Sequence, residues 1–297
     1  MSSIPVYPRR LKVGGSDVNG LAGSAVHASL CHMSSAKMPG AETLAKSPSL
    51  PMQIFGVTGL PEVAAGDNLA QLLVHALKAQ RIVPRHGDVF VVAQKILSKA
   101  EGRTVQLDTI KPSEKAERWA AQYHKDPRLI EIVLREASGI VRMERGVIIA
   151  KTQHGFVCAN AGVDLSNVPQ GAALLLPEDP DRSASALQQE LTRSFGVHVA
   201  VIISDTFGRP WREGLVNVAL GVAGMTPLTD YREQPDPHGN TLKATVIAVA
   251  DEFAAAAGLV MGKLNRIPAA VIRGMELPEG TGTGRDLIRP PERDLFP

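Results

Sequence analysis

Cysteine and aromatic residues are scarce in this chain of 297 residues, which has 2 cysteines and an aromatic fraction of 4%. Cys31 and Cys158 cannot form a disulfide framework or a zinc site built from several thiolates. Val, Leu, Ile and Ala must therefore fill most of the core. No apolar run approaches the roughly 20 residues of a membrane-spanning helix, and the apolar segment of a secretory signal is also missing. We expect a cytoplasmic protein in a reducing compartment.

Charge and familiar motifs exclude further classes of function. The formal net charge is only +2, and no basic stripe is interleaved with aromatic residues, so nucleic acid is not an expected partner. The sequence contains no GxxxxGK[ST], GxSxG or HExxH motif. The run GTGTG at residues 280–284 resembles a dinucleotide-binding loop, but it opens no predicted helix, and we do not assign it that role.

The first 51 residues differ in composition from the rest of the chain. Ser, Ala, Gly and Pro dominate there, hydrophobic periodicity is missing, and the few charges are mostly basic. Such a segment buries too little apolar surface to offset the entropy lost on ordering. We predict a disordered N-terminal extension at residues 1–51, an ordered domain at 52–276 and an extended tail at 277–297.

Strand and helix patterns alternate irregularly in the ordered part, with a hairpin among them. This arrangement favours a mixed α+β fold over a doubly wound parallel sheet. Apolar β-branched runs predict buried strands, and apolar residues at helical spacing predict amphipathic helices. The predicted strands are 53–57, 89–92 and 199–203, the helices 68–80, 183–196 (capped by Ser183) and 250–262, the hairpin 140–150, and a further extended segment 242–249.

The stretch VAVIISDTFGRPWREG, at residues 199–214, carries the clearest chemical signal. The predicted strand ends at Ser204, so Asp205 and Thr206 are expected at its exit. A carboxylate beside a hydroxyl offers hard oxygen ligands that suit Mg²⁺ or Mn²⁺. Arg209 and Arg212 follow, and two guanidinium groups near such a site suit a polyphosphate. The same pattern also fits an Asp that caps a helix, followed by two solvated arginines.

Polar segments follow two other predicted strands. Lys99 lies in the exit of the strand at 89–92, and Asp164 and Asn167 lie in the loop after residues 156–159. Two carboxylates on separate strand exits can hold one or two divalent ions against a triphosphate, with lysine and arginine offsetting the remaining charge. A lysine cluster is also common at a solvated rim.

Five sequence blocks recur in a fixed order and carry a family resemblance. They are GLPEV at 59–63, QKILSKAEGR at 94–103, NAGVDLSNV at 160–168, SDTFGRPWREG at 204–214, and ADEFAAAAGLVMGK with IPAAVIRG at 250–274. Together they resemble the coenzyme F-420:L-glutamate ligase family, in particular its bacterial form, over about residues 53–274. Some relatives continue into a nitroreductase-like flavin domain, which we expect this chain to lack.

The resemblance implies a ligase that depends on GTP and a divalent metal and adds L-glutamate to the deazaflavin F-420-0 during coenzyme F-420 biosynthesis. It implies an acyl-phosphate intermediate and release of GDP. Mg²⁺ or Mn²⁺ is the expected metal, and K⁺ is a further candidate cation. The implied structure is a γ-glutamyl-ligase-like fold that forms an intertwined homodimer.

The resemblance also assigns roles by position. Asp164, Asp205 and Thr206 match the metal ligands. The candidate catalytic residues Lys99, Arg209 and Arg212 come instead from the charge that a polyphosphate requires. The matched GTP contacts are Leu60, Pro61, Glu62, Val63, Gln94, Lys95, Lys99, Asn167, Gly262 and Lys263. Archaeal members have Ser-Thr where this chain has Gln94-Lys95. The loop at 262–266 lacks the acidic, glycine-rich character that accompanies another metal contact in those members, which weighs against a second metal site.

Two alternatives from other classes remain open. The chain could be a nucleotide-binding regulator without catalysis, although the joint presence of Asp164, Asp205 and Thr206 argues against this. It could also be a related amide ligase that acts on another carboxylate, such as a folate-like or peptide acceptor.

Overall fold

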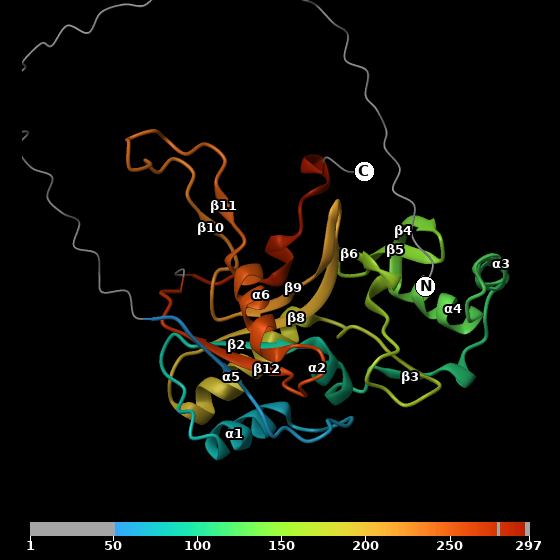
Figure 1. Cartoon of the computed structure of the whole chain (residues 1–297), viewed down its shortest axis with the longest axis horizontal. Helices are drawn as coiled ribbons and strands as arrows, with labels where there is room; N and C mark the ends of the chain where they lie inside the picture. Colours follow the sequence, from blue (N-terminus) through green and yellow to red (C-terminus); the bar gives the residue numbers. More distant parts are fainter. Residues whose placement is uncertain (1–50, 278–279, 295–297) are drawn as a thin grey trace, which may run out of the picture. The chain divides into compact units, whose positions relative to one another are not determined.

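The computed structural model describes residues 51–277 and 280–294 (Figure 1). Apart from Pro51, the predicted N-terminal extension lies outside the described residues. The described part is a mixed α+β fold, as the sequence pattern predicted. Its strands form a five-stranded sheet, a three-stranded sheet and two two-stranded sheets. None of the helices in these residues is long and apolar enough to cross a membrane.

The five-stranded sheet has the strand order β1-β12-β2-β8-β9. Its strands are β1 (Gln53–Gly56), β2 (Val89–Ala93), β8 (Ala200–Arg209), β9 (Arg212–Ala223) and β12 (Ala269–Arg273). β2 and β8 are parallel, with Ala93 opposite Ser204, and the other neighbours are antiparallel. The carboxyl end of β2 therefore lies beside the middle of β8, where the polar part of the long motif begins.

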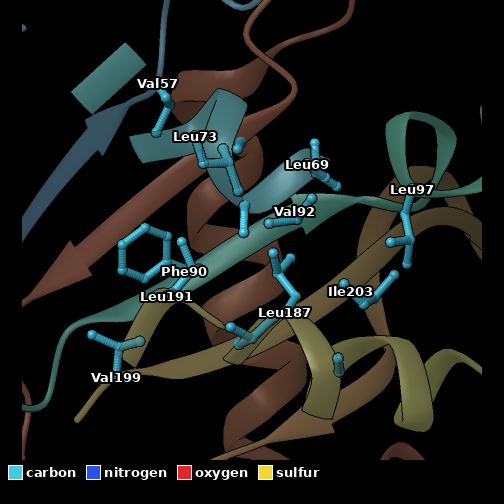
Figure 2. Close-up of a cluster of buried hydrophobic side chains, with 14 of the residues drawn as sticks. Val57, Leu69, Leu73, Phe90, Val92, Leu97, Leu187, Leu191, Val199 and Ile203 are labelled. Atoms are coloured by element: carbon cyan, nitrogen blue, oxygen red, sulfur yellow. The ribbon is translucent and has the colours of Figure 1, made fainter. Parts of the chain in front are cut away.

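Helices cover both faces of this sheet. α1 (Leu69–Ala79), α2 (Gln94–Ala100) and α5 (Pro180–Phe195) share a hydrophobic core with one face, which Figure 2 shows around Leu73, Phe90 and Leu187. α6 (Val249–Met261) packs on the other face. Phe90 belongs to the first core and Val91 to the second, since successive side chains of a strand point to opposite faces. Burial on both faces explains why β2 is apolar without alternation.

Residues 104–176 add smaller sheets and two helices. β3 (Thr104–Gln106) pairs with β7 (Ala172–Leu174), and β4 (Ala137–Glu144), β5 (Val147–Thr152) and β6 (Val157–Ala159) form the three-stranded sheet. α3 (Glu114–Tyr123) and α4 (Pro127–Glu136) pack against these strands through a hydrophobic core of their own. The short 3-10 helices η1 (Leu107–Thr109) and η2 (Asn160–Gly162) contribute Leu107 and Ala161 to this core.

β8 is longer than the sequence predicted. The expected end at Ser204 was wrong: the strand continues to Arg209, and Asp205 and Thr206 pair with Val218 and Asn217 of β9. These polar residues stay extended because β9 supplies their backbone partners, which a local pattern cannot reveal.

A bulge bends the hairpin at the point where the polar residues begin. Ile203 pairs with Gly221 and Ser204 with Ala219, so β9 carries one extra residue there. The backbone N–H of Ala219 donates to the Asp251 carboxylate of α6 at 2.8 Å. This bond fixes the bulge against the helix, and bulges of this kind re-aim the side chains that follow.

Three local predictions were wrong. The segment after β2 is the helix α2 and not an irregular exit. α5 begins at Pro180 with Asp179 as its cap, four residues before the expected cap Ser183, because proline suits the first helical turn. In the segment 242–249 only β11 (Val246–Ile247) is a strand, since its partner β10 (Thr229–Asp230) is equally short.

The GTGTG run has a packing role. A Cβ at Gly284 would lie 2.2 Å from the Leu220 carbonyl oxygen, and a Cβ at Gly282 would lie 2.2 Å from Pro227. Glycine is therefore required at residue 284 for the close approach to β9 and at residue 282 for the close approach to Pro227. The run leads into the 3-10 helix η3 (Gly284–Leu287), and η4 (Pro291–Arg293) follows.

Candidate active site

A cavity of about 740 Å³ opens where the end of β2, the middle of β8 and the end of α6 meet. Segments far apart in the sequence converge on it. The predicted site residues that line the cavity are Leu60, Pro61, Glu62, Val63, Gln94, Lys95, Lys99, Asn167, Asp205, Thr206, Gly262 and Lys263. The sequence therefore identified most of the wall.

α2 explains how two lysines reach this cavity together. The helix starts directly after β2 at Gln94, whose buried side-chain oxygen accepts a hydrogen bond from Ser98 at 2.8 Å. Lys95 and Lys99 are four residues apart, so one turn of helix places them on the same face. Both are paired with carboxylates: Lys99 with Glu62, and Lys95 with Asp164.

Asp164 is held rigidly beside Lys95. Its backbone forms a bridge with Leu174, and its Oδ1 accepts from the Ser166 N–H at 2.6 Å. The Lys95 ammonium also donates to Ser166 Oγ, and it donates to Asn167 Oδ1 at 3.3 Å. Burial alone would raise the pKa of Asp164, but the hydrogen bonds from Lys95 and Ser166 outweigh it and lower the pKa below its usual value. Asp164 is therefore ionised at neutral pH.

Asp205 differs from Asp164 in its electrostatics. Burial raises the pKa of Asp205 to about 6, although the Thr206 backbone amide and the charges of Lys95 and Lys263 act to lower it. The nearby Asp164 carboxylate raises it further. The raised pKa means that nearby positive charges do not fully offset the cost of burying the ionised form of this half-buried carboxylate. A bound cation would stabilise the ionised form.

Thr206, Asn217 and Lys263 form a hydrogen-bonded group beside Asp205. The Thr206 hydroxyl donates to Asn217 Oδ1 at 2.9 Å and accepts from the Lys263 ammonium at 2.6 Å. Sequence reasoning missed Asn217, which lines the cavity from β9 opposite Thr206. The sequence feature that could have identified Asn217 is its amide side chain within the otherwise apolar run LVNVAL. Ser204 and Arg266 are the other polar lining residues that the prediction left out.

The donors fit a hard divalent cation. Among residues 51–277 and 280–294, no group of three or more His, Cys, Asp or Glu side chains could hold a metal. The cavity instead offers Asp205 and Thr206, whereas the predicted ligand Asp164 is not among the lining residues and is ion-paired with Lys95, which lines the cavity. Mg²⁺ typically takes one or two protein carboxylates and completes its shell with water and substrate phosphates. The position of Asp205 and Thr206 in the lining of one cavity is the observation that supports this fit.

Arg209 and Arg212 do not line this cavity. They lie at the end of the β8–β9 hairpin, which extends beyond the sheet as a two-stranded ribbon (Figure 1). Arg209 donates to the Glu213 carbonyl at 2.8 Å, and Arg212 is exposed. The exposed fractions of Trp211 and Leu215 at the same tip are 81% and 65%. Within one chain, Arg209 and Arg212 therefore lie outside the cavity that Lys99 and most other predicted site residues line.

Comparison with known proteins adds an independent result. The family described as "F420-0:Gamma-glutamyl ligase" matches residues 58–274, which include every segment that lines the cavity. The coenzyme F420:L-glutamate ligase of Methanothermobacter thermautotrophicus is 47% identical over 248 residues, which are 82% of this chain and 98% of that protein. The protein of the same name from Methanopyrus kandleri is 46% identical over 240 residues, 79% and 93% of the two chains. The one from Haloarcula marismortui is 42% identical over 251 residues, 82% and 95%.

Proposed function

Since this chain belongs to the F420-0:gamma-glutamyl ligase family, we propose that it adds L-glutamate to F-420-0 in coenzyme F-420 biosynthesis, using GTP and a divalent metal. The observation that carries this proposal is the cavity in which Asp205 and Thr206 lie beside Lys95, Lys99 and Lys263. Oxygen donors next to several ammonium groups are what a metal–triphosphate complex requires. That this chain is of the bacterial form of the family stays a prediction.

GTP is the proposed occupant of the cavity. A volume of about 740 Å³ falls within the usual range for pockets that bind ligands of this size. Leu60, Val63 and Ile267 offer apolar surface for the guanosine, and Lys95, Lys99 and Lys263 line the same cavity. Asp164, Asp205 and Thr206 would hold Mg²⁺ or Mn²⁺, which when bound neutralises charge on the phosphate oxygens.

The proposed reaction has two steps, and neither requires a protein nucleophile. A carboxylate oxygen of F-420-0 attacks the γ-phosphorus, and the bond to the oxygen of GDP breaks, which leaves an acyl phosphate. The amine of L-glutamate then attacks the acyl carbon, the C–O bond breaks, phosphate leaves, and the amine proton passes to water. Lys95, Lys99 and Lys263 offset the phosphate charge during both steps.

We propose a γ-glutamyl-ligase-like fold and a homodimer in which the hairpin tip enters the partner. Trp211 and Leu215 present apolar surface at the tip, which supports a role in contact with another chain. Arg209 and Arg212 would then act on the phosphates of the partner's cavity, since they cannot serve their own.

The test is to incubate the full chain with F-420-0, GTP, Mg²⁺ and L-glutamate and to measure product masses. We expect F-420-0 to gain glutamyl residues while GTP becomes GDP and phosphate. The Asp205→Asn enzyme, measured in parallel, should give no product. GTP binding without any product would favour the regulatory alternative, and GDP release only with another carboxylic acid would favour the related ligase.

A further inference from the structure

Gln94 is a buried side chain with one polar atom unpaired. Its exposed fraction is 1%, yet it lines the cavity. Its Oε1 accepts a hydrogen bond from the Ser98 hydroxyl at 2.8 Å, whereas its Nε2 has no hydrogen-bond partner among the residues that the structure describes. In the same residues, the fully enclosed side-chain atoms without a partner are His154 Nδ1 and Arg209 Nε. The Nε2 of Gln94 is therefore not enclosed, and it faces the cavity that Gln94 lines.

Ser98 fixes the orientation of this amide. It is fully buried, it does not line the cavity, and it follows Gln94 by four residues on α2. A carboxamide has one acceptor oxygen and an NH₂ group with two donors. Because the oxygen of Gln94 accepts from Ser98, the amide can present only its N–H donors to the cavity. An acceptor that enters the cavity can take these donors without breaking a hydrogen bond within the protein.

The charge of the cavity indicates what kind of acceptor this is. The charged side chains that line it are Lys95, Lys99, Lys263, Arg266, Glu62 and Asp205. Four of these are cationic and two are acidic, so the lining favours an anion. Gln94 and Ser98 form one row on α2, and Lys95 and Lys99 form the adjacent row, since residues four apart are neighbours on a helix. An anionic ligand therefore meets ammonium groups and the amide donors along the same helix.

We propose that Gln94 donates a hydrogen bond to a phosphate oxygen of the ligand, and that Ser98 is the positioning residue that holds the amide in this orientation. An amide N–H cannot bind a cation, whereas a phosphate oxygen is a strong acceptor. The inference rests on the proposed function, which supplies GTP as the polyphosphate. It goes beyond that function by giving Gln94 a specific bond and by assigning its orientation to Ser98, which does not touch the ligand.

The test uses inorganic tripolyphosphate without metal as the probe, titrated into the full chain and followed by phosphorus NMR. Gln94→Glu keeps an acceptor for Ser98 but presents carboxylate oxygen in place of the N–H donors. Gln94→Met keeps the approximate size and removes both the acceptor and the donors. We expect each variant to bind tripolyphosphate about tenfold more weakly or worse, as is typical when a hydrogen bond to a charged group is lost. If Gln94 served only to pair with Ser98, the Gln94→Glu protein would bind like the wild type.

A double-mutant cycle tests the positioning role of Ser98. Ser98→Ala leaves the Gln94 amide free to turn and should weaken binding several-fold. In a Gln94→Met background it should cause no further loss, because its effect passes through Gln94. Gln94→Leu takes the place of Gln94→Met should that variant not fold. Gln189→Glu is the matched control: Gln189 donates to Ser185 Oγ at 3.2 Å, with the same spacing on α5 but outside the cavity, and the variant should bind like the wild type.

Three results would overturn the inference: wild-type affinity in Gln94→Glu, additive losses in the cycle, or no tripolyphosphate binding by the wild type. GTP titrated in parallel should lose affinity by the same factor, and a loss for GTP alone would place the amide at the base and also overturn it. Neither F-420-0 nor glutamate is present in these measurements. A failed ligase assay with Gln94-dependent tripolyphosphate binding would therefore contradict the proposed function and leave this inference standing.

Discussion

The Nζ of Lys95 lies 2.5 Å from the Oδ2 of Asp164. One of the two carboxylates that we propose as metal ligands therefore forms an ion pair with an ammonium group. Lys95 also acts electrostatically on Asp205, the other carboxylate. The same side chain lines the cavity proposed for GTP. If the metal and GTP bind as we propose, Lys95 contacts both sites, and its removal should change the affinities for the metal and for GTP in opposite directions.

We expect Lys95→Met to bind Mn²⁺ several-fold more tightly than the wild type and GTP more weakly. The variant frees the Asp164 carboxylate from its ion pair, and it removes a positive charge from the cavity in which we propose that GTP binds. Mn²⁺ titration and GTP calorimetry measure the two effects. Lys78→Met, on the last turn of α1, is the control and should change neither. A change of the same sign in both affinities would refute the placement of Lys95 between them.

Asp205→Asn should stabilise the metal-free protein at neutral pH. The folded protein holds the Asp205 proton up to pH 6, since its pKa is about 6, whereas an unfolded Asp has a pKa of about 3.9. The wild-type free energy of unfolding therefore falls as the pH rises from about 4 to about 6 and stays low above this range. The difference corresponds to ~3 kcal/mol, and partial exposure to solvent reduces it to about 2 kcal/mol. Urea denaturation at pH 4 and pH 8 should show a variant that is more stable only at pH 8.

The same Asp205→Asn variant should lose metal-dependent turnover while it keeps its fold. The change removes a charged ligand at nearly constant volume, and the metal supplies several kcal/mol of charge stabilisation in such reactions. Addition of Mg²⁺ should raise the melting temperature of the wild type and not that of the variant. Turnover like that of the wild type at ordinary Mg²⁺ concentrations would eliminate Asp205 as a ligand.

Arg212→Lys should lower turnover more than it weakens GTP binding, because lysine keeps the charge but loses the planar fork. Calorimetry with and without Mg²⁺, beside steady-state rates, separates the two effects. GTP should bind weakly without metal, since the sequence has no phosphate-binding loop whose backbone amides could take over the role of the metal. Unchanged rates would remove Arg212 from the mechanism, and tight binding without metal would contradict the proposed site.

Mixing two inactive variants tests whether the hairpin acts in the partner. Arg212→Ala lacks the guanidinium, and Asp205→Asn lacks the carboxylate of the cavity. A heterodimer would contain one complete site if Arg212 acts across the interface. Random exchange of subunits should restore about a quarter of the wild-type rate. If Arg212 served its own chain, the mixture would stay inactive.

The segment before Met52 should be dispensable. Its composition lacks apolar periodicity, so it offers little surface to pack on the rest of the protein. A chain that starts at Met52 retains Gln53, which opens β1 and pairs with Arg273 of β12. We expect an unchanged melting temperature and unchanged activity, measured against the full chain. A loss of either would show that residues 1–51 contribute to the folded body.

The sequence predicted the buried strands and the amphipathic helices because these carry their own periodicity. The run at 89–92 and the helix α6 are examples, since burial on a fixed face repeats every two or every 3.6 residues. It was wrong about the end of β8 and about α2. Both depend on partners distant in the sequence: β9 keeps Asp205 and Thr206 extended, and Leu97 of α2 is buried in the core that α1 and α5 share.

By itself, the sequence determined the α+β class, the family and most of the residues that line the cavity, because five ordered blocks and local periodicity are properties of the chain alone. Only the tertiary structure decided how these residues are used. It paired Lys95 with Asp164, set Asn217 against Thr206, raised the pKa of Asp205 by burial, and moved Arg209 and Arg212 away from their own cavity. Distances and desolvation depend on which segments meet in space, and a spacing along the chain does not contain that information.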